Sequence, residues 1–311
     1  MNRLLPKWLF DFISKKYLLD YIYEIRIRIN SPIMINYRGS YEFLTNKVGF
    51  DDKFVYANSD LINYIVTVAT KQSIYAYNDE IKHCYIQAGG GIRIGICGTV
   101  VYGDGKVMTI KNISSLNIRI AHEVINCSKN IIDLICQNGF VKNTLIISPP
   151  GQGKTTLIRD IVQKLSNEKN INNLLVVDER FEIAGGFPIE LNVGKTTDVI
   201  SGCEKSFAFF EALKTMNPSV IVTDEISSEK DIEAVCYAIR SGVSVIASAH
   251  AKNLSDLKTK KYFSNIIAEG YFERFVVLSN RNGVGTIDGV FDENFRVLFV
   301  PYLLWKFCLL F

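Results

Sequence analysis

The stretch Thr144–Leu157, TLIISPPGQGKTTL, has the residue types and the spacing of a phosphate-binding loop. An apolar run rich in Ile leads into a turn of Pro and Gly, and Lys154 and Thr155 open a predicted helix. Loop N–H groups and the helix N-terminus attract anionic oxygens, Lys154 would reach the β- and γ-phosphates of a nucleotide, and the Thr155 hydroxyl would bind Mg²⁺. We therefore expect the nucleotide to contact a run of consecutive residues, namely Pro149, Pro150, Gly151, Gln152, Gly153, Lys154, Thr155 and Thr156.

One position of this loop departs from the strict pattern GxxxxGK[ST], because Ser148 stands where the first Gly is expected. Ser adopts a positive φ less readily than Gly, so the substitution weakens the match if the loop needs that conformation there. The alternative interpretation of the segment is a Gly-rich turn in front of an ordinary helix.

A second apolar run ends in two carboxylates. Pro218–Glu225, PSVIVTDE, is rich in β-branched residues and predicts a strand that ends at Asp224 and Glu225. Asp224 is suited to hold Mg²⁺, and Glu225 could act as the general base that polarises an attacking water. An Asp-Glu pair at the start of a solvated turn is the alternative, but the position of this pair after the loop favours the functional interpretation.

Polar residues also follow two further predicted strands. Leu174–Val177 leads into Asp178, Glu179 and Glu182, and Val243–Ala249 leads into His250. In an open parallel sheet, ligands bind beyond the carboxyl ends of the strands, so all four strand ends would lie at one edge. A single His after a strand can equally have a structural role, so their shared placement carries the argument.

The elements that position these residues alternate between β and α patterns from about residue 126 onward, which predicts a mainly parallel sheet. Helices are expected at Thr155–Leu165, Glu204–Met216 and Glu229–Ser241, the last ending at Gly242.

Residues 1–125 indicate a smaller α+β domain in front of the α/β domain at 126–311. The alternation in EIRIRIN predicts a strand, Asp60–Gln72 predicts a helix with Asp60 as its N-cap, and hairpin turns are expected at Asn78-Asp79, Gly89–Gly91 and Gly103–Gly105.

Composition places the chain among folded globular proteins. It has 311 residues, 48% of them hydrophobic, and a formal net charge of +3. Lys and Arg are scattered among nearly equal numbers of acidic residues, so no nucleic-acid partner is expected. The seven cysteines form no CxxC pair, and their odd number fits reduced thiols in the cytoplasm.

Both ends of the chain are apolar. The first 25 residues predict an amphipathic helix with Leu, Trp and Phe on one face, because Asp11 and Lys15-Lys16 interrupt the apolar core that a signal peptide needs. This helix would pack against the protein or make a peripheral membrane contact. Near the other end, Arg296–Val300 predicts a core strand, and Tyr302–Phe311 would either dock onto a membrane or membrane-bound partner or fold back into the core.

Four segments that follow the loop resemble a known family. They are VVDERFEIAGG, TTDVISGCEKS, NPSVIVTDEI and ASAHAKNLSDL, and in this order they resemble the stage III sporulation protein AA family. That family is similar to the ATPases of type II and type IV secretion systems. EIRIRINSPIMI, GGGIRIGICGTVVYGDGKV and FERFVVLSNRNGVGTIDGVFD extend the resemblance over nearly the whole chain.

The resemblance implies a RecA-like P-loop NTPase core that uses ATP and Mg²⁺. Lys154 and Thr155 match its Walker A positions, and Asp224 and Glu225 match Walker B. Further site residues fall in segments that resemble the acidic box of the secretion ATPases (Asp178, Glu179 and Glu182) and their His box, which senses the γ-phosphate (His250).

Relatives of this kind form rings, usually hexamers, in which arginines of the preceding domain complete a neighbour's site. Arg93 and Arg119 are the candidates for that role, with Arg26, Arg28 and Arg180 as alternatives, and each arginine could instead belong to an ion pair at a surface or a domain interface.

The function implied is Mg²⁺-dependent ATP hydrolysis that powers or assembles a membrane channel complex during endospore formation. The catalytic residues would be Glu225, Lys154, Glu179, His250, Arg93 and Arg119. The resemblance implies a cytoplasmic protein, with a peripheral position at a membrane on the mother-cell side of the forespore as an alternative. Two alternatives stay open, a nucleotide-binding assembly scaffold with little hydrolysis and a DNA-dependent P-loop motor.

Overall fold

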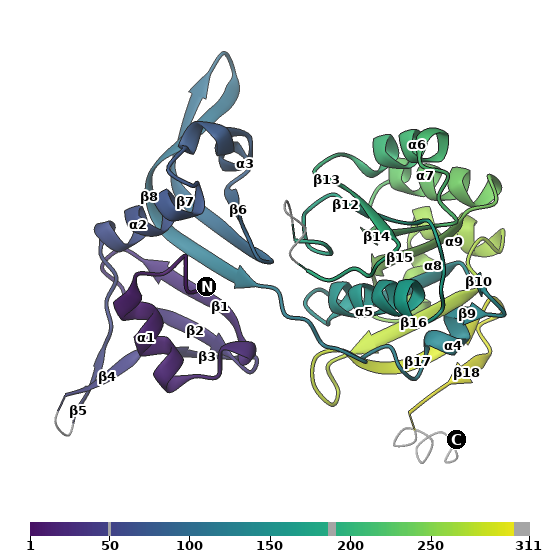
Figure 1. Ribbon diagram of the computed structural model, residues 1–311, viewed down its shortest axis with the longest axis horizontal. Coiled ribbons are helices and arrows are strands. Elements are labelled where there is room, and N and C mark those ends of the chain that lie inside the picture. Colours follow the sequence, from purple (N-terminus) through teal and green to yellow (C-terminus); the bar gives the residue numbers. More distant parts are fainter. Residues whose placement is uncertain (49–50, 186–190, 302–311) are drawn as a thin grey trace. The chain divides into compact units, whose positions relative to one another are not determined.

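The computed structural model describes residues 1–48, 51–185 and 191–301. The chain forms two compact units, of which one comprises Met1–His122 and the other begins at Glu123. Each unit has its own hydrophobic core. Figure 1 shows the elements of both units, coloured along the chain.

The first unit is built on an antiparallel sheet with the strand order β3-β2-β1-β8-β7-β6. Ile25 and Ile27 are fully buried on one face of β1, whereas Arg26 and Arg28 lie on the other, which confirms the strand that the alternation in EIRIRIN predicts. The strands are β1 (Ile22–Arg28), β2 (Met34–Tyr37), β3 (Ser40–Phe43), β6 (Tyr85–Gly89), β7 (Ile92–Gly103) and β8 (Lys106–Ile120), with a separate hairpin of β4 (Thr45–Val48) and β5 (Asp51–Phe54).

Helix α2 (Ser59–Ala69) begins and ends earlier than predicted. Its N-cap is Asn58 rather than Asp60, because the extended Asn58 accepts the Leu61 N–H through its side chain at 2.9 Å. Asp60 therefore lies in the first turn, where its charge suits the helix dipole. The helix ends before Lys71, which adopts a positive φ of 49°. The expected turn at Asn78-Asp79 is also wrong, since these residues open helix α3 (Asn78–Lys82).

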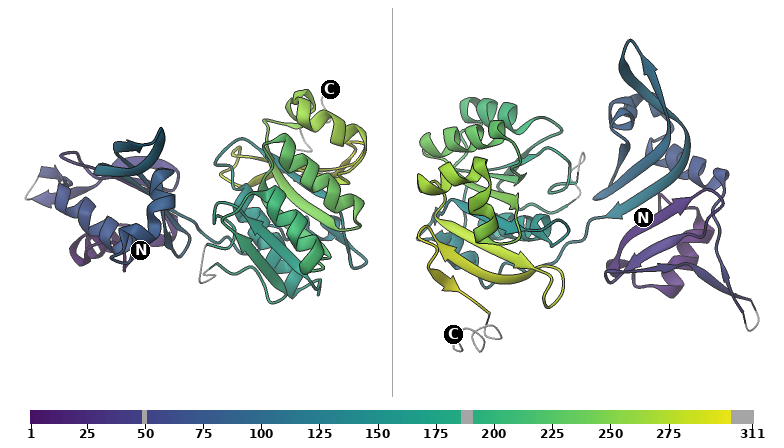
Figure 2. Two further views of the ribbon diagram at one scale, coloured as in Figure 1. Left: turned by 90° about the horizontal axis from the view of Figure 1, so that it is seen from above. Right: turned by 180° about the vertical axis from the view of Figure 1, so that it is seen from behind.

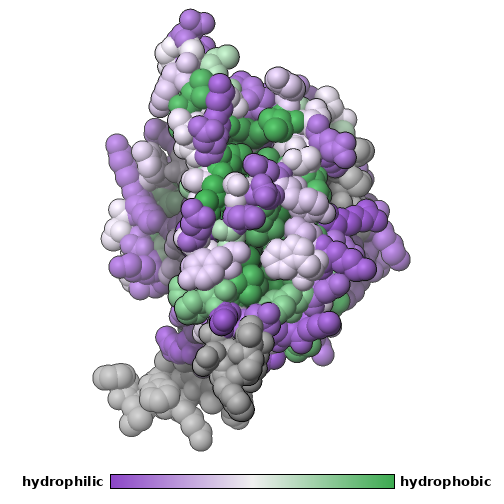
Figure 3. All heavy atoms as spheres, turned by 90° about the vertical axis from the view of Figure 1, so that its left-hand side faces the viewer, coloured by the Kyte–Doolittle hydropathy of each residue, from purple (hydrophilic) through white to green (hydrophobic). Residues whose placement is uncertain are grey.

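Helix α1 (Lys7–Lys16) packs on the same core through Leu9 and Ile13, which are fully buried. Trp8 is 54% exposed, so the predicted apolar face that includes Trp is wrong at this residue. The packing of Leu9 and Ile13 bears out the expectation of a helix against the body of the protein. Hydrophobic residues also remain at the surface, and Figure 3 shows them as a narrow band between hydrophilic ones.

The second unit is built on a mostly parallel sheet with the order β13-β12-β14-β15-β11-β16-β17-β18, as the alternating pattern predicts. Only the pairs β16–β17 and β17–β18 are antiparallel within the described residues. The strands are β11 (Thr144–Ser148), β12 (Leu174–Asp178), β13 (Thr197–Ser201), β14 (Val220–Glu225), β15 (Ser244–His250), β16 (Arg274–Ser279), β17 (Thr286–Asp292) and β18 (Val297–Phe299), and a small hairpin of β9 (Cys136–Gln137) and β10 (Phe140–Val141) precedes them.

Helices cover both faces of this sheet (Figure 2). Alternate residues of β11 point to opposite cores, with Ile146 packing on one side and Leu145 and Ile147 on the other. Ile146 shares its core with α4 (Ile132–Ile135) and α5 (Lys154–Asn167), and the opposite core holds residues of α6 (Lys205–Thr215), α7 (Glu229–Arg240), α8 (Leu254–Thr259) and α9 (Lys261–Ala268). Burial on both faces explains why these strands read as continuous apolar runs.

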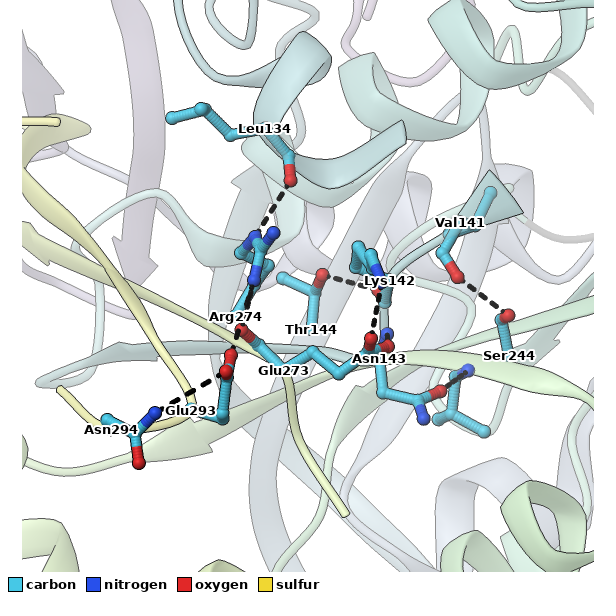
Figure 4. A network of polar contacts seen from close by, with 11 residues as sticks. Leu134, Val141, Lys142, Asn143, Thr144, Ser244, Glu273, Arg274, Glu293 and Asn294 are labelled. Atoms are coloured by element: carbon cyan, nitrogen blue, oxygen red, sulfur yellow. Dashed lines mark hydrogen bonds and ion pairs between the residues drawn. The ribbon is translucent and has the colours of Figure 1, made fainter. Parts of the chain in front are cut away.

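A network of polar contacts connects the N-terminal ends of three parallel strands (Figure 4). These ends lie at the side of the sheet opposite the carboxyl ends of the strands. Glu273 accepts hydrogen bonds from Lys142 Nζ at 2.7 Å and from Asn143 N–H at 3.0 Å. Ser244 donates to the Val141 carbonyl at 2.8 Å, and Arg274 donates to the Leu134 carbonyl at 2.9 Å. The network holds β11, β15 and β16 together at their first residues.

Strand β18 differs from the predicted core strand at Arg296–Val300. Val297 and Leu298 are 57% and 40% exposed, because β18 is the outermost strand and has only β17 as a neighbour within the described residues. The apolar segment Tyr302–Phe311 lies outside the described residues. Among the helices that the structure describes, none is both long and apolar enough to cross a membrane.

Candidate nucleotide site

The loop after β11 has the backbone conformation that an anion-binding turn needs. Gly151 and Gly153 adopt positive φ values of 72° and 86°, and Gly153 is the N-cap of α5. A Cβ at Gly153 would lie 3.1 Å from the Gly285 Cα, a tight contact, so both the positive φ and the limited space favour glycine there. Ser148, in contrast, ends strand β11 opposite His250 of β15, and the extended strand places no demand for glycine on that position.

Lys154 is almost buried at the start of α5, with 7% exposure. Its ammonium donates to His250 Nδ1 at 2.7 Å and to the carbonyls of Ser148 and Pro149 at 3.2 Å and 3.3 Å. Burial lowers the pKa of Lys154 to about 8, although the carboxylates of Glu225 and Glu182 act in the opposite direction. Burial therefore disfavours the charged form of Lys154, and an anion bound beside it would raise the pKa of this side chain.

His250 connects the loop lysine with the second carboxylate of β14. Because an ammonium only donates, Nδ1 of His250 accepts from Lys154, and Nε2–H donates to Glu225 Oε2 at 2.6 Å. Lys154 at the start of α5, His250 at the end of β15 and Glu225 at the end of β14 thus form one chain of contacts. Thr155 and Thr156 lie in the first turn of α5, after the turn of Pro149, Pro150, Gly151 and Gln152.

Asp224 is paired with a lysine that the sequence analysis did not identify. Lys205, the first residue of α6, places its ammonium 2.8 Å from Asp224 Oδ1 and also contacts the Glu179 carboxylate. Burial raises the pKa of Asp224 to about 6, and Lys205 opposes that rise. Burial alone would lower the pKa of Lys205, but the two carboxylates outweigh it, so the pKa is raised.

The position of Lys205 near the start of the predicted helix Glu204–Met216 could have indicated that it has acidic partners. Cations are unfavourable in the first turn of a helix, where the backbone dipole is positive. A lysine at the start of a predicted helix is therefore expected to have carboxylate partners.

Asp178 has a structural place at the end of β12. It is fully buried, and its carboxylate accepts N–H groups of Glu182, Ile183 and Ala184 at 2.8, 3.0 and 2.8 Å. Arg159 of α5 donates to the carbonyls of Glu182 and Ile183. Asp178 and Arg159 together fix the loop that presents Glu182, while Glu179 faces Lys205.

Arg93 and Arg119 lie in the first unit, apart in sequence from the four strand ends of the second. They are direct cross-strand partners on β7 and β8 and therefore share one face of the sheet. The Arg93 guanidinium stacks over the Tyr85 ring at 4.1 Å. Of the alternatives, Arg26 is ion-paired with Glu24 and lies over the Tyr41 ring.

Comparison with known proteins identifies relatives that match most of the chain. Residues 3–298 match the family described as "Sporulation stage III, protein AA". The chain is 36% identical over 285 residues to stage III sporulation protein AA of Bacillus subtilis (strain 168), covering 89% of each protein. Among solved structures it is similar to the Yersinia pseudotuberculosis ATPase DotB, with a TM-score of 0.61, 15% identity, and coverage of 93% of this chain and 80% of that one.

It is also similar in fold to the pilus retraction motor PilT, solved with bound ADP, with a TM-score of 0.53 and 14% identity over 85% of this chain and 76% of that one. At these identities the two structures establish a shared α/β fold.

Proposed function

Because the chain belongs to the family of sporulation stage III protein AA, we propose that it is a Mg²⁺-dependent ATP hydrolase with a RecA-like P-loop core. The observation that carries the proposal is the chain of contacts between Lys154 at the start of α5, His250 at the end of β15 and Glu225 at the end of β14. The loop in front of Lys154 contains two glycines with positive φ, as an anion-binding loop would. The fold shared with the ATPase DotB and with the pilus retraction motor PilT supports it.

The residues present fit a magnesium ion bound together with nucleotide. Asp224 supplies a buried carboxylate and Thr155 a hydroxyl, and hard oxygen ligands of this kind suit Mg²⁺, which commonly takes one or two protein ligands and completes its shell with phosphates and water. When bound, the metal would neutralise charge that develops on the phosphate oxygens.

Hydrolysis would follow from the contacts of the chain's own side chains. Lys154 would transfer its hydrogen bonds from His250 and the loop carbonyls to the phosphates, where its ammonium stabilises the transferring group. Glu225 would position the attacking water and accept its proton, held in orientation by His250 Nε2–H. Glu179 would contribute indirectly, because it contacts the same lysine, Lys205, that is paired with Asp224.

The active assembly would be a ring, hexameric as in secretion ATPases, in which Arg93 and Arg119 of one copy approach the phosphates of the next. Such arginines stabilise charge in the transition state of phosphoryl transfer. The ring would act in the cytoplasm, peripherally at a membrane, and its partner would be a channel complex of the sporulation or secretion type.

Nucleotide binding and turnover, measured separately, test the proposal. We expect the unmodified protein to bind a fluorescent ATP analogue and to release phosphate when Mg²⁺ is present, and Lys154→Ala to lose both properties. Phosphate release by Lys154→Ala at the unmodified rate would refute the assignment of this loop.

A further inference from the structure

Lys205 has an environment that ordinary helix chemistry does not explain. It is 3% exposed and occupies the first position of α6, where the helix dipole repels a cation. Its ammonium lies between Asp224 of β14 and Glu179, the residue that follows β12, so one cation joins the ends of two neighbouring strands to one helix.

Negative charge is concentrated at this point of the sheet edge. Asp178 is the last residue of β12, Glu179 follows it, and Asp224 is the second-last residue of β14, which pairs directly with β12; Asp178 and Asp224 are both buried. Asp178 is occupied by three backbone N–H groups, which leaves Glu179 and Asp224 to be balanced by a cation. Lys205 is the side chain whose ammonium contacts both of them. An unpaired buried carboxylate is costly, so some positive charge is needed at this position.

We propose that Lys205 is a positioning residue that holds Asp224 in the nucleotide-free site as a built-in substitute for a divalent cation, and that it releases this carboxylate when a metal–nucleotide complex binds. The inference rests on the proposed function in that Asp224 is taken as the metal ligand. The ammonium and the metal compete for the same buried oxygen, Asp224 Oδ1. Lys205 therefore sets how strongly the site depends on the metal.

The competition has a consequence for α6. When the metal takes Asp224, Lys205 keeps only Glu179 as a partner, so the first turn of α6 is held by one ion pair instead of two. Metal binding at Asp224 would in this way weaken the contacts that hold the start of α6, one of the helices packed on the sheet.

The first experiment measures the melting temperature of the full chain against MgCl₂ without nucleotide, for the unmodified protein, Lys205→Met and Lys164→Met. Lys164 is the matched control, because it is a buried, ion-paired lysine of α5 whose partners are Glu168 and Asn126. We expect Lys205→Met to melt lower without metal and to gain several-fold more from Mg²⁺ than the unmodified protein, since Glu179 and Asp224 would then bind the ion. Lys164→Met should gain no more than the unmodified protein. An equal gain in all three would overturn the proposal.

A second variant covers the case in which Lys205→Met does not fold. Lys205→Arg keeps the charge, and a guanidinium binds carboxylates in a fork that a metal displaces less easily. We expect this variant to bind a fluorescent ATP analogue as the unmodified protein does without Mg²⁺, but to gain several-fold less affinity when Mg²⁺ is added. An unchanged gain would count against Lys205. If the unmodified protein binds no nucleotide at all, the proposed function fails, while the melting experiment still judges the role of Lys205.

Discussion

Replacing Asp178 would test whether this carboxylate is structural, in contrast to the neighbouring carboxylates that we propose take part in catalysis. The carboxylate accepts three N–H groups, with Oδ2 serving Ile183 and Ala184 and Oδ1 serving Glu182. An asparagine can keep its single oxygen on Ile183 and Ala184, but its NH₂ group then faces the Glu182 N–H. Asp178→Asn therefore loses one hydrogen bond and leaves one donor unsatisfied, at a cost of about 1–3 kcal/mol.

Asp178→Ala loses all three acceptor contacts and should cost more, about 3–6 kcal/mol. The upper end is limited because burial raises the pKa of Asp178 in spite of its N–H partners, so removing the buried charge returns part of the loss. For a unit of this size we expect the Asn variant to melt about 2–12 °C lower, and the Ala variant lower still.

Thermal and urea unfolding of the two variants would measure these costs, with Asp198→Asn on the exposed side of β13 as the control. The control should stay within about 0.5 kcal/mol of the unmodified protein. If Asp178→Asn and Asp178→Ala were no less stable than this control, the three contacts would not hold the loop, and the structural role of Asp178 would be refuted.

Three further outcomes follow from the same structure. Glu225→Gln keeps a side chain that can contact His250 but loses the base, so this variant should bind ATP while its turnover rate falls about 10²–10⁴-fold. The control Glu229→Gln, at an exposed position, should hydrolyse ATP normally. Normal turnover by Glu225→Gln would exclude Glu225 as the base. Arg119→Ala and Lys154→Ala, each inactive alone, should regain activity when mixed if Arg119 acts on a neighbouring copy, and no recovery at any ratio would place Arg119 outside the neighbour's site. Burial, followed by the nearby Asp160 carboxylate, raises the pKa of the Cys127 thiol to about 12, so only about one Cys127 side chain in 10⁴ is a thiolate at pH 8. Iodoacetamide should therefore label the exposed Cys84 far faster than Cys127, and equal labelling rates would contradict this expectation.

The parts of the fold that the sequence predicted are those set by local pattern. The apolar runs before Asp178, Asp224 and His250 form parallel strands because each is long enough to span a sheet and is buried on both faces. The sequence did not predict features that depend on a single side-chain contact or on the order of strands in the sheet. Asn58 replaced Asp60 as a cap through a single hydrogen bond, and β18 is exposed because it lies at the edge of the sheet.

The candidate site shows the same division. Lys154, Glu225 and His250 follow from strand ends in a parallel sheet, and their contacts agree with that placement. Lys205 could not be placed by spacing alone, because its partners are Glu179, which follows β12, and Asp224 of β14, and these strands become neighbours only when the chain folds. Asp178 and Glu179 are adjacent in sequence, yet Asp178 ends β12 and accepts backbone N–H groups, whereas Glu179 lies in the turn after the strand and contacts Lys205.

The most direct test of the account is the rate of phosphate release from Mg²⁺-ATP at several concentrations of the purified chain, with Lys154→Ala measured in parallel. We predict activity that rises more steeply than the protein concentration and is absent from Lys154→Ala, because neighbouring copies would complete each site. Activity in strict proportion to concentration would contradict the sharing of arginines between copies. Equal release by the unmodified protein and Lys154→Ala would contradict the central claim that this loop hydrolyses ATP.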